Sequence, residues 1–248
     1  VAALVEPPRL GVAEARRAAL ARLSERDGRS YEAMLARSAD LPEPTRRLLA
    51  VRLAELIDYQ SVAYAAGYAD FVAQVAAVER QALGAPGRVT DAVARHLHKL
   101  LAYKDEYEVA RLHLKEVRRA RPKALFVEPR RVIYLLHPPL LRALGLKRKL
   151  ALDARWIDPL FRLLRGLRGL RGTPFDPFAR TRARREERRL PGWYRDLIRA
   201  ALERLTPETV ATVVEIAELP DLIRGYEQIK RDAVRVAAQR ATELVERL

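Results

Sequence analysis

The sequence predicts a mainly α fold: a multi-helix domain with a long antiparallel helical hairpin and one small β-hairpin. Three observations lead to this prediction. Alanine, leucine and arginine dominate the chain and are strong helix formers, whereas only 6% of the 248 residues are aromatic. Apolar residues recur every three or four positions over long segments. Glycine and proline separate those segments, as they do at helix ends.

The N-terminal third of the chain is predicted to contain a linker and then helices. Residues 1–12 are expected to form an extended linker, because they hold Pro7, Pro8 and Gly11. Two short helices are expected within 13–38. A long helical stretch follows from about 44 to 83, and Pro44 suits its first turn, where a missing N–H costs nothing.

A second long helix is predicted from 90 to 119, after the helix-breaking segment Gly84–Gly87. Two long helices joined by so short a loop imply an antiparallel hairpin. The apolar positions of the second helix recur at spacings of three and four and are predicted to form one buried stripe: Leu97, Leu100, Tyr103, Tyr107, Ala110 and Leu114.

The middle of the chain is predicted to hold the β-hairpin. Two short β-like runs, 124–127 and 132–136, flank the turn-like segment 128–131. Helical pattern then returns, with Asp158 as an N-cap and Pro159 as the first helical residue.

Three Leu-Arg-Gly triplets run into two prolines in the segment 163–178, LLRGLRGLRGTPFDPF. The glycines match no phosphate-binding loop, since neither GxGxxG after a strand nor GxxxxGK[ST] is present. We interpret the segment as a structural elbow in which Gly172 follows the end of a helix. Phe175 and Phe178 are expected to anchor this elbow in the core. The alternative is that Arg168 or Arg171 binds an anion.

Further amphipathic helices are predicted at 193–205, from 207, and at 221–247. No internal linker is evident, so 13–248 is expected to be a single mainly helical accessory domain. The chain begins at Val1 rather than methionine, which suggests a piece of a longer polypeptide.

Charge and composition limit the possible chemistry. The net charge is +15, which fits either a polyanionic partner or solvated arginine-rich helix faces, and the interleaved acidic residues favour the latter. The absence of cysteine excludes disulfides, cysteine nucleophiles and thiolate-held Fe–S clusters within this chain. The four histidines are too scattered to indicate a metal site. No serine lies in a GxSxG motif, and no apolar run is long enough for a transmembrane helix.

Several segments resemble the C-terminal region of bacterial indolepyruvate ferredoxin oxidoreductases, which belong to the 2-oxoacid:ferredoxin oxidoreductases. The similarity is most specific in AYKDEYEVARL (Ala102–Leu112), RGLRGTPFDPF (Arg168–Phe178) and LPDLIRGYEQIK (Leu219–Lys230). It extends over about 45–245, with further support from LIDYQSVAYAAGY (Leu56–Tyr68), LLHPPLL (Leu135–Leu141) and 187–194.

The resemblance implies an enzyme that oxidatively decarboxylates aryl pyruvates to acyl-CoA, with ferredoxin as the electron acceptor. Such an enzyme uses thiamine diphosphate, Mg²⁺, Fe–S clusters and coenzyme A. This chain has no cysteine, and it lacks a Gly-Asp-Gly motif followed by a metal-binding asparagine. We therefore expect no cofactor and no catalytic residue in it. The expected role is a cytoplasmic, non-catalytic domain that packs against the catalytic domains of the same oxidoreductase and meets ferredoxin only indirectly.

The motif residues are candidates for holding that interface or for contacting coenzyme A phosphates. They are Lys104, Asp105, Glu106, Arg168, Arg171, Asp176 and Arg224. A coenzyme A or anion-binding module is one alternative function, and a basic helical nucleic-acid-binding domain is another, less favoured one. The identity of the 2-oxoacid, the role of the domain within the enzyme and the oligomeric state stay open at this point.

Overall fold

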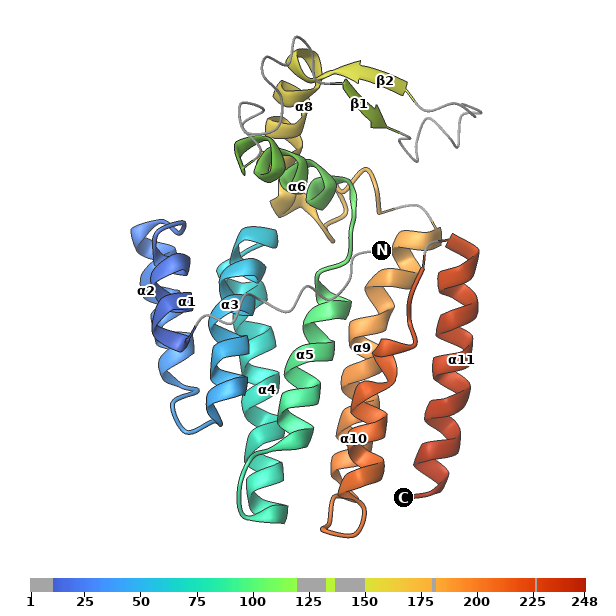
Figure 1. Ribbon diagram of the computed structural model, residues 1–248. Helices are drawn as coiled ribbons and strands as arrows, with labels where there is room; N and C mark the ends of the chain where they lie inside the picture. Colours follow the sequence, from blue (N-terminus) through green and yellow to red (C-terminus); the bar gives the residue numbers. More distant parts are fainter. Residues whose placement is uncertain (1–10, 120–132, 137–149, 180–181, 226) are drawn as a thin grey trace. The chain divides into compact units, whose positions relative to one another are not determined.

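The computed structural model describes residues 11–119, 133–136, 150–179, 182–225 and 227–248 (Figure 1). Over these residues the protein is mainly α-helical, which confirms the predicted class. The chain divides into two compact units: unit 1 contains residues 1–103 and 179–248, and unit 2 contains residues 104–178. The expected single domain over 13–248 stays a prediction.

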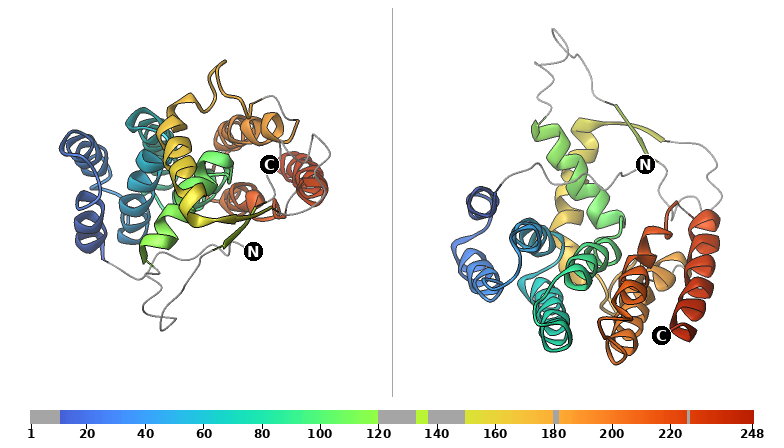
Figure 2. Two further views of the ribbon diagram at one scale, coloured as in Figure 1. Left: turned by 90° about the horizontal axis from the view of Figure 1, so that it is seen from above. Right: turned by 60° about the horizontal axis from the view of Figure 1, so that its bottom comes forward.

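Unit 1 is a bundle of helices built around α3 and α5. Helix α3 contacts α1, α2, α4 and α5, and α5 also contacts α9 and α10 (Figures 1 and 2). The elements of its described residues are α1 (Val12–Leu20), α2 (Glu25–Ala36), α3 (Glu43–Tyr59), α4 (Val62–Leu83), α5 (Arg88–Leu101), α9 (Arg182–Leu202), α10 (Val210–Glu218), the 3-10 helix η3 (Leu219–Asp221) and α11 (Glu227–Glu246).

The predicted helical hairpin exists, but its helices are shorter than expected. The stretch 44–83 is interrupted after Tyr59, and Ser61 starts α4 by accepting a hydrogen bond from the Tyr64 amide at 3.2 Å. The hairpin is therefore α4–α5. It turns at the predicted breaker, where Gly84 has a φ of +85°, a conformation that glycine adopts without strain.

The helix predicted from 90 to 119 is also two helices, α5 and α6 (Glu106–Arg119). The side chain of Asp105 accepts a hydrogen bond from the Glu108 amide at 2.8 Å and so begins a new helix. The prediction of one continuous apolar stripe was wrong for this reason. Leu97 and Leu100 lie in the core of unit 1, whereas Ala110 lies in the core of unit 2.

Unit 2 combines two helices with a small antiparallel β-pair. Strand β1 (Ile133–Leu136) pairs with β2 (Leu150–Asp153), with Ile133 opposite Asp153 and Leu136 opposite Leu150. The strand predicted at 132–136 is thus present, but its partner is β2 rather than 124–127. That predicted strand lies outside the described residues.

Helix α8 (Ala154–Gly166) packs on α6 and continues into the 3-10 helix η2 (Leu167–Leu170). The small core of unit 2 contains Ala110 from α6 with Ile157 and Phe161 from α8. The prediction that Asp158 and Pro159 begin this helix was wrong. Asp153 is the N-cap, accepting from the Arg155 amide at 2.9 Å, and Pro159 lies inside the helix.

Two other helix boundaries differ from the prediction. Helix α9 begins at Arg182 and passes through Pro191, so it is longer than the helix expected from 193 to 205. Helix α11 begins at Glu227 rather than 221, after Gly225, whose φ is +91°. A left-handed residue interrupts helical geometry, which separates η3 from α11.

Candidate functional site

A buried ion pair in unit 2 joins the start of α6 to the residue that follows η2. The Arg171 guanidinium donates from Nε to Asp105 Oδ2 at 2.5 Å and from Nη2 to Asp105 Oδ1 at 2.8 Å. Each side chain is only 3% exposed. The same carboxylate caps α6 through the Glu108 amide. Such a two-point pair is strongly oriented, because the planar guanidinium matches the carboxylate.

Tyr107 extends this buried cluster. The Arg171 guanidinium lies over its ring, 5.4 Å from the centroid, and its hydroxyl donates to Asp176 Oδ1 at 3.2 Å. Burial and, next, the neighbouring Asp176 carboxylate raise the pKa of the Tyr107 phenol above its ordinary value. The phenol is therefore protonated at neutral pH and keeps donating its hydrogen bond.

Asp176 also shapes the elbow. Its carboxylate accepts hydrogen bonds from the Gly172 amide at 3.1 Å and the Phe178 amide at 3.0 Å. Gly172 has a φ of +83° after η2, so its predicted position beyond the end of a helix is confirmed. Phe178 packs edge-on against Tyr107 at 5.2 Å between centroids. Phe175 is 81% exposed, so the prediction that it anchors in the core was wrong.

The structure brings three of the seven candidate residues together: Asp105, Arg171 and Asp176. We call them, with Tyr107, the elbow cluster. Its carboxylates and guanidinium are nearly inaccessible to solvent and face one another. This arrangement stabilises a local fold, since a substrate-binding cation would need an open face.

The other candidates lie apart from the elbow cluster or on its edge. Lys104 is exposed, and the half-buried Glu106 lies in the first turn of α6. Arg168 is half-buried, and its Nε atom is buried without a hydrogen-bond partner among the described residues. Arg224 belongs to unit 1, where it is exposed and donates from Nε to the Asp221 carbonyl at 2.8 Å.

The tyrosines of LIDYQSVAYAAGY each bind a backbone carbonyl in unit 1. Tyr59 donates to the carbonyl of Tyr103 at 3.0 Å, Tyr64 to that of Leu101 at 3.1 Å, and Tyr68 to that of Ala94 at 2.7 Å. Burial raises the pKa of Tyr68, so its hydroxyl stays protonated. These contacts attach α3 and α4 to α5 and to the residues that follow it.

Two further segments of the resemblance meet in unit 1. Lys230 on α11 contacts Glu187 on α9 at 2.7 Å, and Arg231 contacts Glu186 at 3.0 Å. Arg188 donates to the Tyr103 hydroxyl at 3.2 Å. These pairs show that 187–194 and 219–230 are neighbours in space, a relationship that sequence spacing could not reveal.

Sequence reasoning missed Glu79, a buried carboxylate at the end of α4. It accepts hydrogen bonds from the Val89 and Thr90 amides at 3.0 and 2.9 Å and from the Thr90 hydroxyl at 2.6 Å. The N-cap of α5 is Gly87, which has no side chain to supply a cap. That missing cap is the signal that could have pointed to a partner from elsewhere in the chain.

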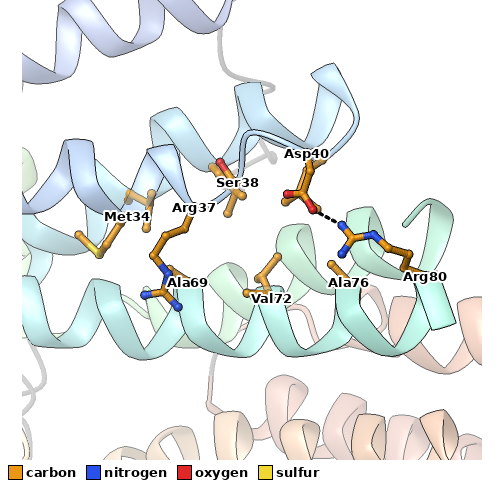
Figure 3. Close-up of a pocket in the computed structure, with 12 residues that line it drawn as sticks. Met34, Arg37, Ser38, Asp40, Ala69, Val72, Ala76 and Arg80 are labelled. Atoms are coloured by element: carbon orange, nitrogen blue, oxygen red, sulfur yellow. Dashed lines mark hydrogen bonds and ion pairs between the residues drawn. The ribbon is translucent and has the colours of Figure 1, made fainter. Parts of the chain in front are cut away.

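The α2, α3 and α4 helices of unit 1 enclose a pocket of about 180 Å³ (Figure 3). Its floor is apolar and includes Met34, Leu53 and Val72. Its two arginines are paired with carboxylates: Arg37 contacts Asp70 at 2.7 Å, and Arg80 contacts Asp40. None of the candidate residues lines this pocket, and its rim cations are already neutralised.

Two other kinds of site were searched for in the described ranges. No group of histidine, aspartate and glutamate side chains there is arranged to hold a metal ion. Within the same ranges, none of the helices has the length and apolar character needed to cross a bilayer.

Comparison with known proteins places the chain in a family. No curated protein and no solved structure matches it. The model of DUF6537, described as a family of unknown function, matches residues 45–243, which is most of the chain. The chain therefore belongs to the DUF6537 family.

Proposed function

We propose that this chain is the non-catalytic C-terminal domain of a cytoplasmic indolepyruvate or related 2-oxoacid:ferredoxin oxidoreductase. In this proposal it packs against the catalytic domains, which hold thiamine diphosphate, Mg²⁺, the Fe–S clusters and coenzyme A. Ferredoxin then meets the catalytic domains and not this chain. The proposal rests first on the sequence resemblance over about 45–245.

The observation that carries the scaffolding role is the condition of the motif residues. Asp105, Arg171 and Asp176 come from the two longest motifs of the resemblance, and all three are buried and hydrogen-bonded within unit 2. The motif tyrosines of α3 and α4 bind backbone carbonyls within unit 1. Residues that act on a substrate need a face open to it. Motif residues that hold a fold instead favour a domain whose shape is what the enzyme uses.

The test is an activity and assembly assay with indolepyruvate, coenzyme A, thiamine diphosphate, Mg²⁺ and an electron acceptor. The chain alone should give no turnover. The oxidoreductase from the same organism should contain this chain, fused or bound, and lose assembly when it is deleted. Supplying the chain in trans should restore the complex, as measured by size-exclusion chromatography and by acyl-CoA formation.

Two variants make the assay specific. Arg171→Leu breaks the elbow cluster and should weaken restoration, whereas Arg224→Gln changes an exposed arginine and should leave it intact. Turnover by the chain alone would contradict a non-catalytic role. Full assembly and activity of the oxidoreductase without this chain would contradict the scaffolding role.

Arg168 favours a second candidate function, the binding of coenzyme A or another anion. Its buried Nε atom has no partner among the described residues, whereas Arg171 is occupied by Asp105. An unsatisfied guanidinium N–H suits a phosphate oxygen. Calorimetry with coenzyme A should then show binding that Arg168→Gln abolishes and Arg165→Gln retains. Equal heats for wild type and Arg168→Gln would remove this candidate.

A further inference from the structure

Helix α8 carries two apolar faces, and one of them has no partner. Its first face, with Ile157 and Phe161, is buried against α6. The second face is open to solvent. It consists of Trp156, which is 83% exposed, Leu160 at 46%, Leu163 at 58% and Leu167 at 39%. We call these four residues the α8 stripe.

The spacing of the α8 stripe matches the contact seam of a helix–helix interface. Its residues are four, three and four positions apart, so they fall on one side of the helix. This is the pattern by which one helix contacts another along a narrow line. The stripe spans about 16 Å, or three helical turns. Contiguous exposed apolar residues of this kind mark an interaction site more often than single ones do.

Arg155 and Arg162 indicate the charge of the partner. At 100° per residue they lie beside the edge of the α8 stripe that faces away from α6. Both side chains are exposed, and neither is paired with a carboxylate of the described residues. Unpaired cations next to an apolar seam favour a partner that carries carboxylates at the matching positions.

We propose that the α8 stripe is the docking surface for an acidic amphipathic helix of a partner polypeptide. Apolar side chains of that helix would cover Trp156, Leu160, Leu163 and Leu167, and its carboxylates would pair with Arg155 and Arg162. This inference concerns the chemistry of the partner and does not depend on the proposed oxidoreductase. It can hold or fail independently of enzymatic activity.

Two other occupants fit the observations less well. A second copy of α8 would bring the same arginines to the seam and no matching carboxylate. A lipid surface requires a broad apolar face that can enter the headgroup region. Here the neighbouring face of α8 is already packed on α6, so only a narrow line of side chains is available.

Fluorescence of Trp156 reports directly on this surface. The chain contains two tryptophans, so Trp193→Phe leaves Trp156 as the sole tryptophan. The full chain with this change is titrated with a helical peptide of about three heptads, with leucine at positions a and d and glutamate at e and g. The emission of Trp156 should move to shorter wavelength as the peptide covers it. The same peptide with lysine in place of glutamate should bind at least about tenfold more weakly.

Variants of exposed residues separate the apolar and the charge contributions. Leu160→Gln with Leu163→Gln should weaken binding by more than about tenfold. The matched control, Ile229→Gln with Val236→Gln, changes exposed apolar residues of α11 and should bind like the parent. Arg155→Glu with Arg162→Glu should reverse the preference toward the lysine peptide. Circular dichroism should show that all these variants stay folded, because the altered side chains are exposed.

Four results would overturn the proposal. They are equal binding of the two peptides, no emission shift with either, normal binding by the Leu160/Leu163 variant, and loss of binding by the α11 control alone. A shift of Trp156 emission on adding anionic lipid vesicles without peptide would assign the stripe to a membrane surface. A concentration-dependent dimer that shields Trp156 would assign it to a second copy.

Discussion

Asp105 and Arg171 have both left water, so each depends on the other for its solvation. The pair is nearly fully buried, and the Asp105 carboxylate also accepts the Glu108 amide. Removing one partner of such a pair leaves an uncompensated charge in the interior, whereas neutralising both is much less costly. At the scale of single residues, this interdependence distinguishes the elbow cluster from the exposed ion pairs of the chain.

Replacing Arg171 should therefore destabilise unit 2 strongly. We expect Arg171→Leu to lower the free energy of unfolding by about 3–5 kcal/mol. Adding Asp105→Asn should recover part of that loss, because the neutral amide still caps α6. Urea unfolding followed by circular dichroism measures both. Arg224→Leu is the exposed control, expected within about 0.5 kcal/mol of wild type. A double variant less stable than Arg171→Leu would contradict this explanation.

His96 gives unit 1 a pH dependence. Burial lowers the pKa of His96 to about 4 from an ordinary 6.5, an effect that Asp221 opposes and Lys99 and Arg95 reinforce. The unfolded chain then binds a proton between pH 6.5 and 4 that the folded chain does not. Stability should accordingly fall as the pH decreases through this window, by up to about 3 kcal/mol.

The measurement is urea unfolding at pH 7.5, 6.5 and 5.5, where most carboxylates remain ionised. His96→Gln removes the titrating group and should flatten the profile over that range. The same slope in the variant and the wild type would assign the pH dependence to another group.

At the scale of elements, the ends of helices are fixed by contacts that are distant in sequence. Glu79 caps α5 from the preceding helix, and Asp176 accepts the amide of Gly172 after η2. Both satisfy backbone N–H groups that local side chains do not. The elbow in particular requires a residue that adopts a positive φ at the point where η2 stops.

Two glycines of the triplets should therefore respond oppositely to alanine. Gly172→Ala forces a left-handed conformation and should cost about 1–2 kcal/mol. Gly169 lies within η2 with open space where a Cβ would point, so Gly169→Ala should be neutral or stabilising by less than about 1 kcal/mol. Thermal unfolding of the two variants provides the comparison. A larger loss for Gly169→Ala would contradict the role assigned to Gly172.

Across the whole molecule, the two units have separate cores of very different size. The core of unit 1 draws on α1 to α5 and α9 to α11, whereas that of unit 2 rests on Ala110, Ile157 and Phe161 with two half-buried leucines. Local stability follows the number of buried apolar contacts, so unit 2 should open more readily than unit 1.

Hydrogen exchange measured by mass spectrometry should show this difference. We expect faster amide exchange in α6 and α8 than in α4 and α5. Arg171→Leu should accelerate exchange in α6 and α8 and leave α4 and α5 unchanged, because the ion pair lies within unit 2. A uniform acceleration over both units would show that they unfold as one.

The sequence predicted those features that depend on neighbouring residues. Gly84–Gly87 indicated the α4–α5 turn, and Gly172 with Pro174 indicated the elbow, because glycine and proline act on the local backbone. It failed where a distant contact determines the outcome. Nothing near Asp105 announces its pairing with Arg171, which lies 66 positions further along the chain. The candidate residues were chosen by resemblance, and their meeting in one cluster is a result of the fold.

The way unit 1 is assembled from two separate stretches of chain bears on its synthesis by the ribosome. Helices α1 to α5 emerge first, and the side of α5 that α9 and α10 cover then has no cover. The intervening residues 104–178 can complete their own unit while the nascent chain waits. Only when residues 182–218 have left the exit tunnel can the first five helices bury that surface, so premature termination before Val210 would release a product with exposed apolar side chains such as Val93 and Leu97.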